Sequence, residues 1–221
     1  MWRILKVSYE DEYKQHGDVE LQKFDNSNQG NQISRAEIAE LIQEGSSTFL
    51  RQEYKYTLAF VIFFSVVIFL TAEQSIGFPY TTVAFIVGAV TSMLSGYIGM
   101  WIAVRANVRT AKKADESLND AFFVAFRGGM VLGFVLVGLA LFMLMLLIII
   151  YKSLMGEDLT GSENDRMEGY LKLFESIAGY GLGGSTVALF GRVGGGIYTK
   201  AADVGADLVG KVVEDLDEDS I

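Results

Sequence analysis

Four uncharged, mostly apolar runs divide the chain and predict its main elements. They cover residues 56–72, 77–104, 128–151 and 176–191. A helix needs roughly 20 apolar residues to cross the hydrocarbon core of a bilayer. The second and third runs exceed this length, the first reaches it with help from flanking residues, and the glycine-rich fourth is marginal. The pattern therefore predicts an all-α, polytopic transmembrane helical bundle with about four crossings.

A soluble protein with long buried helices is the alternative. It is disfavoured because 221 residues cannot supply a soluble shell around three uncharged runs of this length. The composition then narrows the function. A hydrophobic content of 51% excludes disorder, and the absence of cysteine excludes disulfides and thiolate metal sites. The single histidine, His16, argues against a Ser–His–Asp relay, and the net charge of −9 argues against nucleic acid as a partner.

The distribution of Lys and Arg predicts the orientation in the membrane. Four cations lie in the 105–120 loop, and Arg51 and Lys55 precede the first run. The turn at 73–76 has no cation, and the 152–170 loop has two cations among five acids. We therefore expect both ends of the chain and the 105–120 loop in the cytosol.

The chain divides into four segments by composition. Residues 1–33 are expected to form a polar tail, and residues 34–55 an amphipathic lead-in helix that Ser34 can cap. Residues 56–200 are expected to hold the transmembrane helices with short loops, and 201–221 a cytosolic helix extension with an acidic end. An interfacial role for the lead-in helix is favoured over a separate binding site.

The most specific charge pattern follows the fourth run. Five charged residues fall on one face of a predicted helix: Arg192, Lys200, Asp203, Asp207 and Lys211. Apolar residues fall on another face, where they can pack: Ile197, Ala201, Val204 and Leu208. The ten glycines between 179 and 210 favour close helix packing, which by itself is a weak signal.

Two interpretations of this charged face remain open from spacing alone. Carboxylates four residues apart can each hold Mg²⁺ through oxygen, and Mg²⁺ usually keeps waters and adds substrate phosphate oxygens. Flanking cations suit the same phosphate ligand. Alternatively, Lys200–Asp203 and Asp207–Lys211 are surface ion pairs that contribute a few tenths of a kcal/mol.

The stretch resembles the membrane-integral, ion-pumping inorganic pyrophosphatases. The resemblance rests on Gly179-Tyr-Gly-Leu-Gly-Gly and on the segment from Ala188 to Lys211, which contains Gly-Arg-Val-Gly-Gly-Gly-Ile-Tyr-Thr-Lys-Ala-Ala-Asp-Val-Gly-Ala-Asp. Shorter upstream matches include Glu53-Tyr54-Lys55, Ala106-Asn107-Val-Arg109-Thr110 and Ala125-Phe-Arg127-Gly128. The similarity extends from about residue 34 to residue 211.

The resemblance implies a role for each charged residue. Lys200 would bind pyrophosphate, Asp203 and Asp207 would coordinate bridging Mg²⁺, and Arg192 would lie below them in the ion pathway. Lys211 is a possible phosphate-side cation. The family's activity is attack of an activated water on phosphorus, coupled to export of H⁺ or Na⁺ from the cytosol by a homodimer. The water-activating acids lie later in the family's pattern, so no catalytic residue is expected here.

The family's chains are much longer than this one. We therefore expect an N-terminal fragment of a larger multi-helix pump, inactive alone, in a vacuolar or acidocalcisome-type endomembrane rather than a plasma membrane. Two other functions compete with this one. The chain could be a non-enzymatic membrane assembly subunit, or a carrier or channel whose glycine-rich helix lines a pore.

Overall fold

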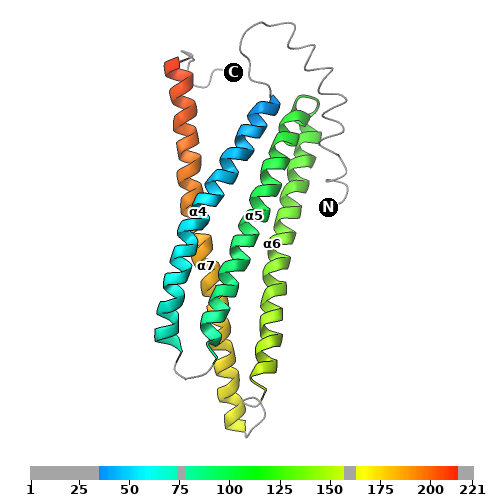
Figure 1. Ribbon diagram of the computed structural model, residues 1–221. Coiled ribbons are helices and arrows are strands. Elements are labelled where there is room, and N and C mark those ends of the chain that lie inside the picture. The colour runs from blue at the N-terminus through cyan, green and yellow to red at the C-terminus, as the bar shows by residue number, and fades with distance from the viewer. Residues whose placement is uncertain (1–34, 74–77, 157–162, 214–221) are drawn as a thin grey trace. The chain divides into compact units, whose positions relative to one another are not determined.

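A computed structural model describes residues 35–73, 78–156 and 163–213, which form long helices (Figure 1). The helices are α4 (Arg35–Ala72), α5 (Tyr80–Ala114), α6 (Leu118–Leu154) and α7 (Glu163–Leu208), and a π-helical segment (Val209–Val213) follows α7 directly. No strand occurs in these described ranges, as an all-α fold requires. The predicted polar tail at 1–33 and the acidic end after Val213 lie outside the described residues.

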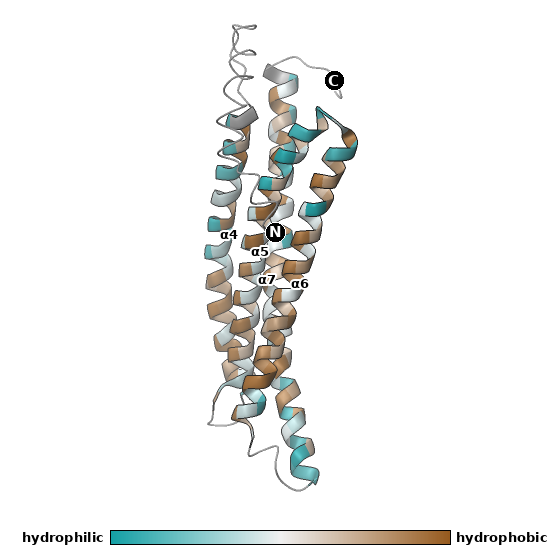
Figure 2. Ribbon diagram, turned by 90° about the vertical axis from the view of Figure 1, so that its right-hand side faces the viewer, coloured by the Kyte–Doolittle hydropathy of each residue, from teal (hydrophilic) through white to brown (hydrophobic). Residues whose placement is uncertain are grey.

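Three helices are long and apolar enough to cross a membrane. They are the segment Glu37–Ala72 of α4, and the whole of α5 and α6. Figure 2 shows hydrophilic residues gathered mainly at one end of each helix, namely the start of α4, the end of α5 and the start of α6, with hydrophobic residues along most of the rest. These helices contain the first and third predicted runs and residues 80–104 of the second, so the prediction of a membrane-embedded helical protein is confirmed.

The glycine-rich run at 176–191 lies inside α7 but does not meet the same test of length and hydropathy. The fourth crossing therefore stays a prediction. With 46 residues, α7 is about 69 Å long at 1.5 Å per residue. Because a bilayer core is about 30 Å thick, α7 has ample length to cross it and still extend well beyond one surface.

The described residues form two compact units. One, called the bundle unit, contains Ser47–Ile102 and the described part of Leu132–Ile221. The other contains the start of α4 and the antiparallel pair formed by the end of α5 and the start of α6, Ala103–Val131, called the hairpin. Every contact discussed below lies within one of these units.

In the bundle unit, α5 and α7 approach each other across bare glycine backbone. A Cβ atom added to Gly183 would overlap the carbonyl oxygen of Phe85, and one added to Gly88 would overlap that of Tyr180. Side chains at these positions would push the two helices apart. Small residues at helix contacts allow this close packing, which drives association where lipid removes the hydrophobic effect between helices.

Two clusters of buried side chains surround this contact. The first joins α5, α6 and α7 and contains Ala84, Leu147, Tyr151, Met155 and Leu173. The second joins α4, α5 and α7 and contains Val61, Ile68, Phe85, Ala89 and Val187. Helices α5 and α7 contribute to both clusters. They therefore form the centre of the unit, with α4 and α6 each packed against them.

Tyrosine hydroxyls add polar contacts between helices. Tyr151 of α6 donates a hydrogen bond to the carbonyl oxygen of Tyr80 at 2.5 Å, and Tyr54 of α4 donates one to Met93 O at 2.5 Å. Tyr180 of α7 donates to Ala140 O at 2.9 Å. The hydrocarbon of a bilayer offers these hydroxyl groups no hydrogen-bond partner, so the carbonyl oxygens take that place. Each such bond contributes about 0.6 kcal/mol on average in a membrane protein.

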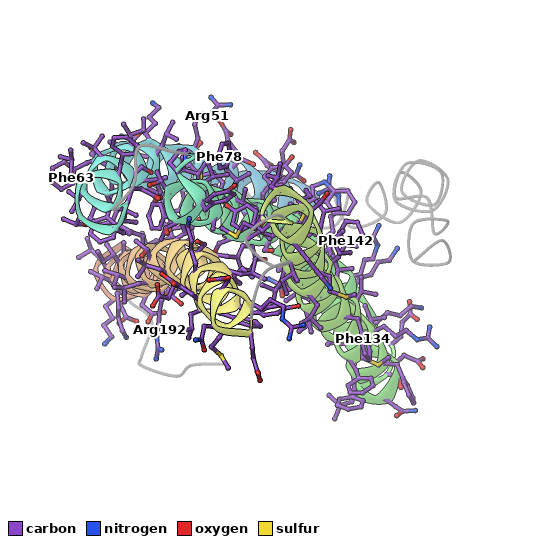
Figure 3. All side chains as sticks on the ribbon, turned by 90° about the horizontal axis from the view of Figure 1, so that it is seen from below. Arg51, Phe63, Phe78, Phe134, Phe142 and Arg192 are labelled. Atoms are coloured by element: carbon purple, nitrogen blue, oxygen red, sulfur yellow. The ribbon has the colours of Figure 1, made fainter. Side chains whose placement is uncertain are left out.

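The outward-facing surface of the unit is apolar. Phe63 of α4 and Phe142 of α6 are 65% and 63% exposed and point away from the other helices of the unit (Figure 3). Water would make such a surface unfavourable, whereas lipid chains solvate it. The exposure therefore agrees with a membrane environment.

Glu73, directly after α4, caps the start of α5. Its Oε1 accepts hydrogen bonds from the backbone N–H groups of Thr81 and Thr82, at 3.0 and 3.1 Å, and from the Thr82 hydroxyl at 3.3 Å. The first N–H groups of a helix have no partner within the helix, and a negative charge there is favourable. Glu73 thus ties the end of one apolar helix to the start of the next.

The close approach of α5 and α7 predicts a difference between two glycines of α7. Gly183→Ala should lower the free energy of unfolding by about 1–3 kcal/mol, because the new methyl group has no space against Phe85. Gly181→Ala, where nothing lies within 4 Å, should be neutral or slightly stabilising, because alanine favours helix. Thermal unfolding in detergent, followed by circular dichroism, compares them. Equal stability of the two variants would contradict the packing described.

The Glu73 cap predicts a second effect on stability. Glu73→Ala should lower the free energy of unfolding by about 1–2 kcal/mol, because two helix N–H groups lose their acceptor. Glu73→Gln keeps an acceptor oxygen without the charge and should lose less. The same unfolding measurement ranks the variants, and an alanine variant as stable as the parent protein would rule out the cap.

Candidate functional site

The predicted charged face lies near the end of α7. Arg192, Lys200, Asp203 and Asp207 belong to one uninterrupted helix, and Lys211 follows in the π-helical segment. On a helix of 3.6 residues per turn, the first four span an arc of about 80°. The structure therefore places these residues on a common helix face. The wider turn of the π-helical segment changes the position of Lys211 relative to the others.

One ion pair joins two members of this face. Lys200 Nζ lies 3.1 Å from Asp203 Oδ2, and the two side chains are 81% and 66% exposed. An exposed pair of this kind contributes at most about 1 kcal/mol, because water screens it and two flexible side chains lose freedom. The contact is one of the two surface pairs that spacing allows. It is weak enough to be broken by a stronger phosphate or metal ligand.

Beyond Tyr198, every residue of α7 from Thr199 to Leu208 is exposed. Asp203 and Asp207 are exposed, and so are the apolar residues of the neighbouring face, Ile197, Val204 and Leu208, at 68%, 64% and 60%. An added Cβ atom would meet nothing within 4 Å at Gly195, Gly196 or Gly205. Both faces are therefore open to further protein or ligand.

Helix α4 supports α7 over the stretch from Phe190 to Tyr198, just before Lys200. The rings of Phe49 and Tyr198 lie with centroids 4.9 Å apart, and those of Phe60 and Phe190 are also 4.9 Å apart. Between these two pairs, the side chain of Glu53 lies against a segment of α7 that carries glycine. These contacts set the position of α7 in the three turns before Lys200.

The position of Glu53 was not evident from sequence reasoning. A Cβ atom added to Gly191 or Gly194 would lie 3.5 or 3.4 Å from Glu53 Oε1, so the carboxylate lies directly against the α7 backbone. Two features of the sequence point to this position of Glu53. It is an acid just before an uncharged run, and helical spacing places it on the same face as Phe49 and Phe60, between them. Arg192 points away from α4, on the other side of α7 (Figure 3).

The described residues do not contain a complete metal site. Nowhere in the ranges 35–73, 78–156 and 163–213 do three or more His, Cys, Asp or Glu side chains gather as metal ligands. Asp203 and Asp207 provide two carboxylates on successive turns of a helix. This donor set suits Mg²⁺, which binds proteins through one or two carboxylates and takes its other oxygens from water and substrate phosphate.

Comparison with known proteins identifies the family. Residues 17–221 match the family described as inorganic H⁺ pyrophosphatase. The K⁺-insensitive pyrophosphate-energised proton pump of Caldanaerobacter subterraneus is 40% identical over 193 residues, covering 83% of this chain and 26% of that protein. A second such pump, from Moorella thermoacetica, is 43% identical, covering 82% of this chain and 24% of that protein.

Relatives with a different transported ion match equally well. The putative K⁺-stimulated pyrophosphate-energised sodium pump of Bacteroides thetaiotaomicron is 41% identical over 187 residues, covering 82% of this chain and 24% of that protein. The chain thus spans about a quarter of the length of the curated relatives it matches. The family match includes every residue of the charged face, and the chain belongs to the inorganic H⁺ pyrophosphatase family.

Proposed function

We propose that this chain supplies the first part of the pyrophosphate site of an ion pump driven by pyrophosphate hydrolysis. The observation that carries the proposal is the common face of α7 on which Lys200, Asp203 and Asp207 are all exposed. The chain's membership in the pyrophosphatase family supports pyrophosphate as the ligand of this face. Relatives named as proton pumps and as sodium pumps leave H⁺ and Na⁺ as the candidate ions.

Each residue of the face has a distinct role in the proposal. The Lys200 ammonium binds a phosphate oxygen of pyrophosphate as a point charge, and Lys211 is a second cation on the phosphate side. Asp203 and Asp207 would hold Mg²⁺, which would supply charge neutralisation and orientation of the phosphates. The ion pair between Lys200 and Asp203 is exposed, so it can open to leave Lys200 for the substrate and Asp203 for the metal.

The proposed topology follows the distribution of cations. The segment 105–120, which contains the turn between α5 and α6, faces the cytosol. The charged end of α7 faces the cytosol too, so pyrophosphate reaches the site from there. Helix α7 crosses the membrane through residues 176–191, and Arg192 lies where the helix leaves the apolar layer, in the ion pathway. The working pump is a homodimer in a vacuolar or acidocalcisome-type membrane.

Two carboxylates are too few to hold a tetra-anionic substrate through several Mg²⁺ ions. The remaining ligands and the groups that activate water therefore come from outside the described residues. The open apolar face of Ile197, Val204 and Leu208 is where other helices of the pump would pack. A non-enzymatic assembly subunit would use this same face but would not depend on Lys200 or Asp203.

The roles of Lys200 and Asp203 predict a large loss of activity in a complete pump. Residues 34–211 would replace the matching segment of the Moorella thermoacetica relative, and Lys200→Ala and Asp203→Ala would be made in this chimera. Each should reduce Mg²⁺-dependent phosphate release at least about a hundredfold, because Lys200→Ala removes a cation that stabilises the phosphate charge and Asp203→Ala removes a ligand of Mg²⁺. Lys152→Ala, an exposed cation near the end of α6, is the matched control and should keep activity.

If the face contained surface ion pairs only, Lys200→Ala would remove at most about 1 kcal/mol of stability and leave turnover unchanged. Retained turnover in both site variants would therefore refute the assignment. It would favour a carrier or channel role for the glycine-rich helix.

The incomplete metal site predicts that the 221-residue chain alone does not hydrolyse pyrophosphate. The purified chain in lipid vesicles should release no phosphate above background at millimolar Mg²⁺, measured with a colorimetric phosphate assay. The active chimera serves as the positive control. Mg²⁺-dependent release by the chain alone, lost in Asp203→Ala, would show that the described residues and their flanking segments form a sufficient site.

A further inference from the structure

The hairpin carries a concentration of positive charge in a strongly acidic chain. The protein has a net charge of −9, yet Ala103–Val131 contains five cations and three acids. The cations are Arg105, Arg109, Lys112, Lys113 and Arg127, and the acids are Asp115, Glu116 and Asp120. None of these residues belongs to the proposed pyrophosphate site.

The packing of the hairpin places cations from both helices on one side. A Cβ atom added to Gly128 of α6 would lie 2.9 Å from the Cβ of Ala106 of α5, so these two residues face each other. Each helix of the pair has one of these facing residues, and we consider the residue that directly precedes it in the sequence. In an antiparallel pair, these two preceding residues lie on the same side. Arg105 and Arg127 therefore share one side of the hairpin.

Arg109 and Lys112 extend this side along α5, because they follow Arg105 by four and seven residues. Arg109 Nη1 donates a hydrogen bond to the carbonyl oxygen of Arg105 at 3.2 Å. Because of this bond, the Arg109 guanidinium lies one helical turn before its own backbone, at the level of Arg105. We call Arg105, Arg109, Lys112 and Arg127 the hairpin basic face.

Positive and negative charges are separated along the hairpin. Arg105 and Arg127 lie beside the apolar runs that cross the membrane, whereas the acids lie at or near the turn, 115–120. Lys113 is not included in the hairpin basic face, because it forms an ion pair with one of the acids: its Nζ lies 2.6 Å from Glu116 Oε2. Asp120 is seven residues, or about 10 Å, farther from the apolar run than Arg127. The three arginines therefore lie nearer the apolar runs than the acids do, whereas Lys112 lies near the turn.

Three exposed aromatic side chains lie on α6 between the turn and Arg127. Phe122, Phe123 and Phe126 are 60%, 47% and 53% exposed, and the rings of Phe122 and Phe126 stack with centroids 5.8 Å apart. They lie farther from the apolar run than Arg127 does, so they are outside the acyl-chain region when Arg127 is at the membrane surface. The position of the arginines beside membrane-crossing runs favours the phosphates of phospholipids over a free phosphate ion as their ligand.

We propose that the hairpin basic face binds the phosphate groups of anionic phospholipids at the membrane surface. Arginine and lysine beside a transmembrane helix attract anionic lipid by about 1 kcal/mol each, and arginine can bind phosphate through two hydrogen bonds. The site anchors the α5–α6 turn to the leaflet that it faces. It does not depend on pyrophosphate binding.

The test uses the purified 221-residue chain and native mass spectrometry with phosphatidylglycerol or phosphatidylcholine. Lys112 and Arg127 are both exposed, so the double variant Lys112→Gln/Arg127→Gln should fold normally, which circular dichroism checks. It should bind phosphatidylglycerol at least about tenfold more weakly. The matched double variant Lys152→Gln/Arg166→Gln removes two exposed cations elsewhere and should bind as the parent does.

Three further measurements make the outcome decisive. Arg127→Lys should keep part of the binding, because it retains the charge and loses only the two-bond geometry. Phosphatidylcholine should bind weakly and alike to all variants, and millimolar inorganic phosphate should not displace phosphatidylglycerol. Equal phosphatidylglycerol binding by the Lys112→Gln/Arg127→Gln variant, or displacement by inorganic phosphate, would overturn the proposal.

Discussion

The backbone contact between α5 and α7 is the constraint on which the bundle unit depends. Lipid offers no hydrophobic driving force to hold apolar helices together, so they must fit closely to associate. Gly88 and Gly183 allow this fit because a side chain at either position would overlap a carbonyl oxygen of the facing helix. The two buried clusters and the three tyrosine hydrogen bonds are arranged around this contact.

This constraint also separates two uses of glycine along α7. At Gly179 and Gly183, bare backbone is needed for the contact with α5. At Gly191 and Gly194, it leaves space in which the carboxylate of Glu53 lies. At Gly195, Gly196 and Gly205, nothing described lies near. The helix thus changes from a tightly packed part, through a part supported by α4, to an open part that carries Lys200, Asp203 and Asp207.

Much of this arrangement follows from sequence pattern. The length of the apolar runs predicted the membrane helices, and helical spacing placed Lys200, Asp203 and Asp207 on one face, as the structure has them. Their roles toward pyrophosphate and Mg²⁺ stay predictions. Periodicity reports which residues share a face but not which helix that face meets. The contact of Gly183 with Phe85 and the place of Glu53 therefore could not be predicted.

The uninterrupted course of α7 has a mechanical consequence. A hydrogen-bonded rod that runs from Glu163 to Leu208 has no joint at which one end could move independently of the other. Rotation about its own axis would turn residues with side chains into the place where only Gly183 fits, so the tight contact blocks twisting. A force on Lys200 therefore moves the whole of α7, which slides along its axis or tilts as one rigid body.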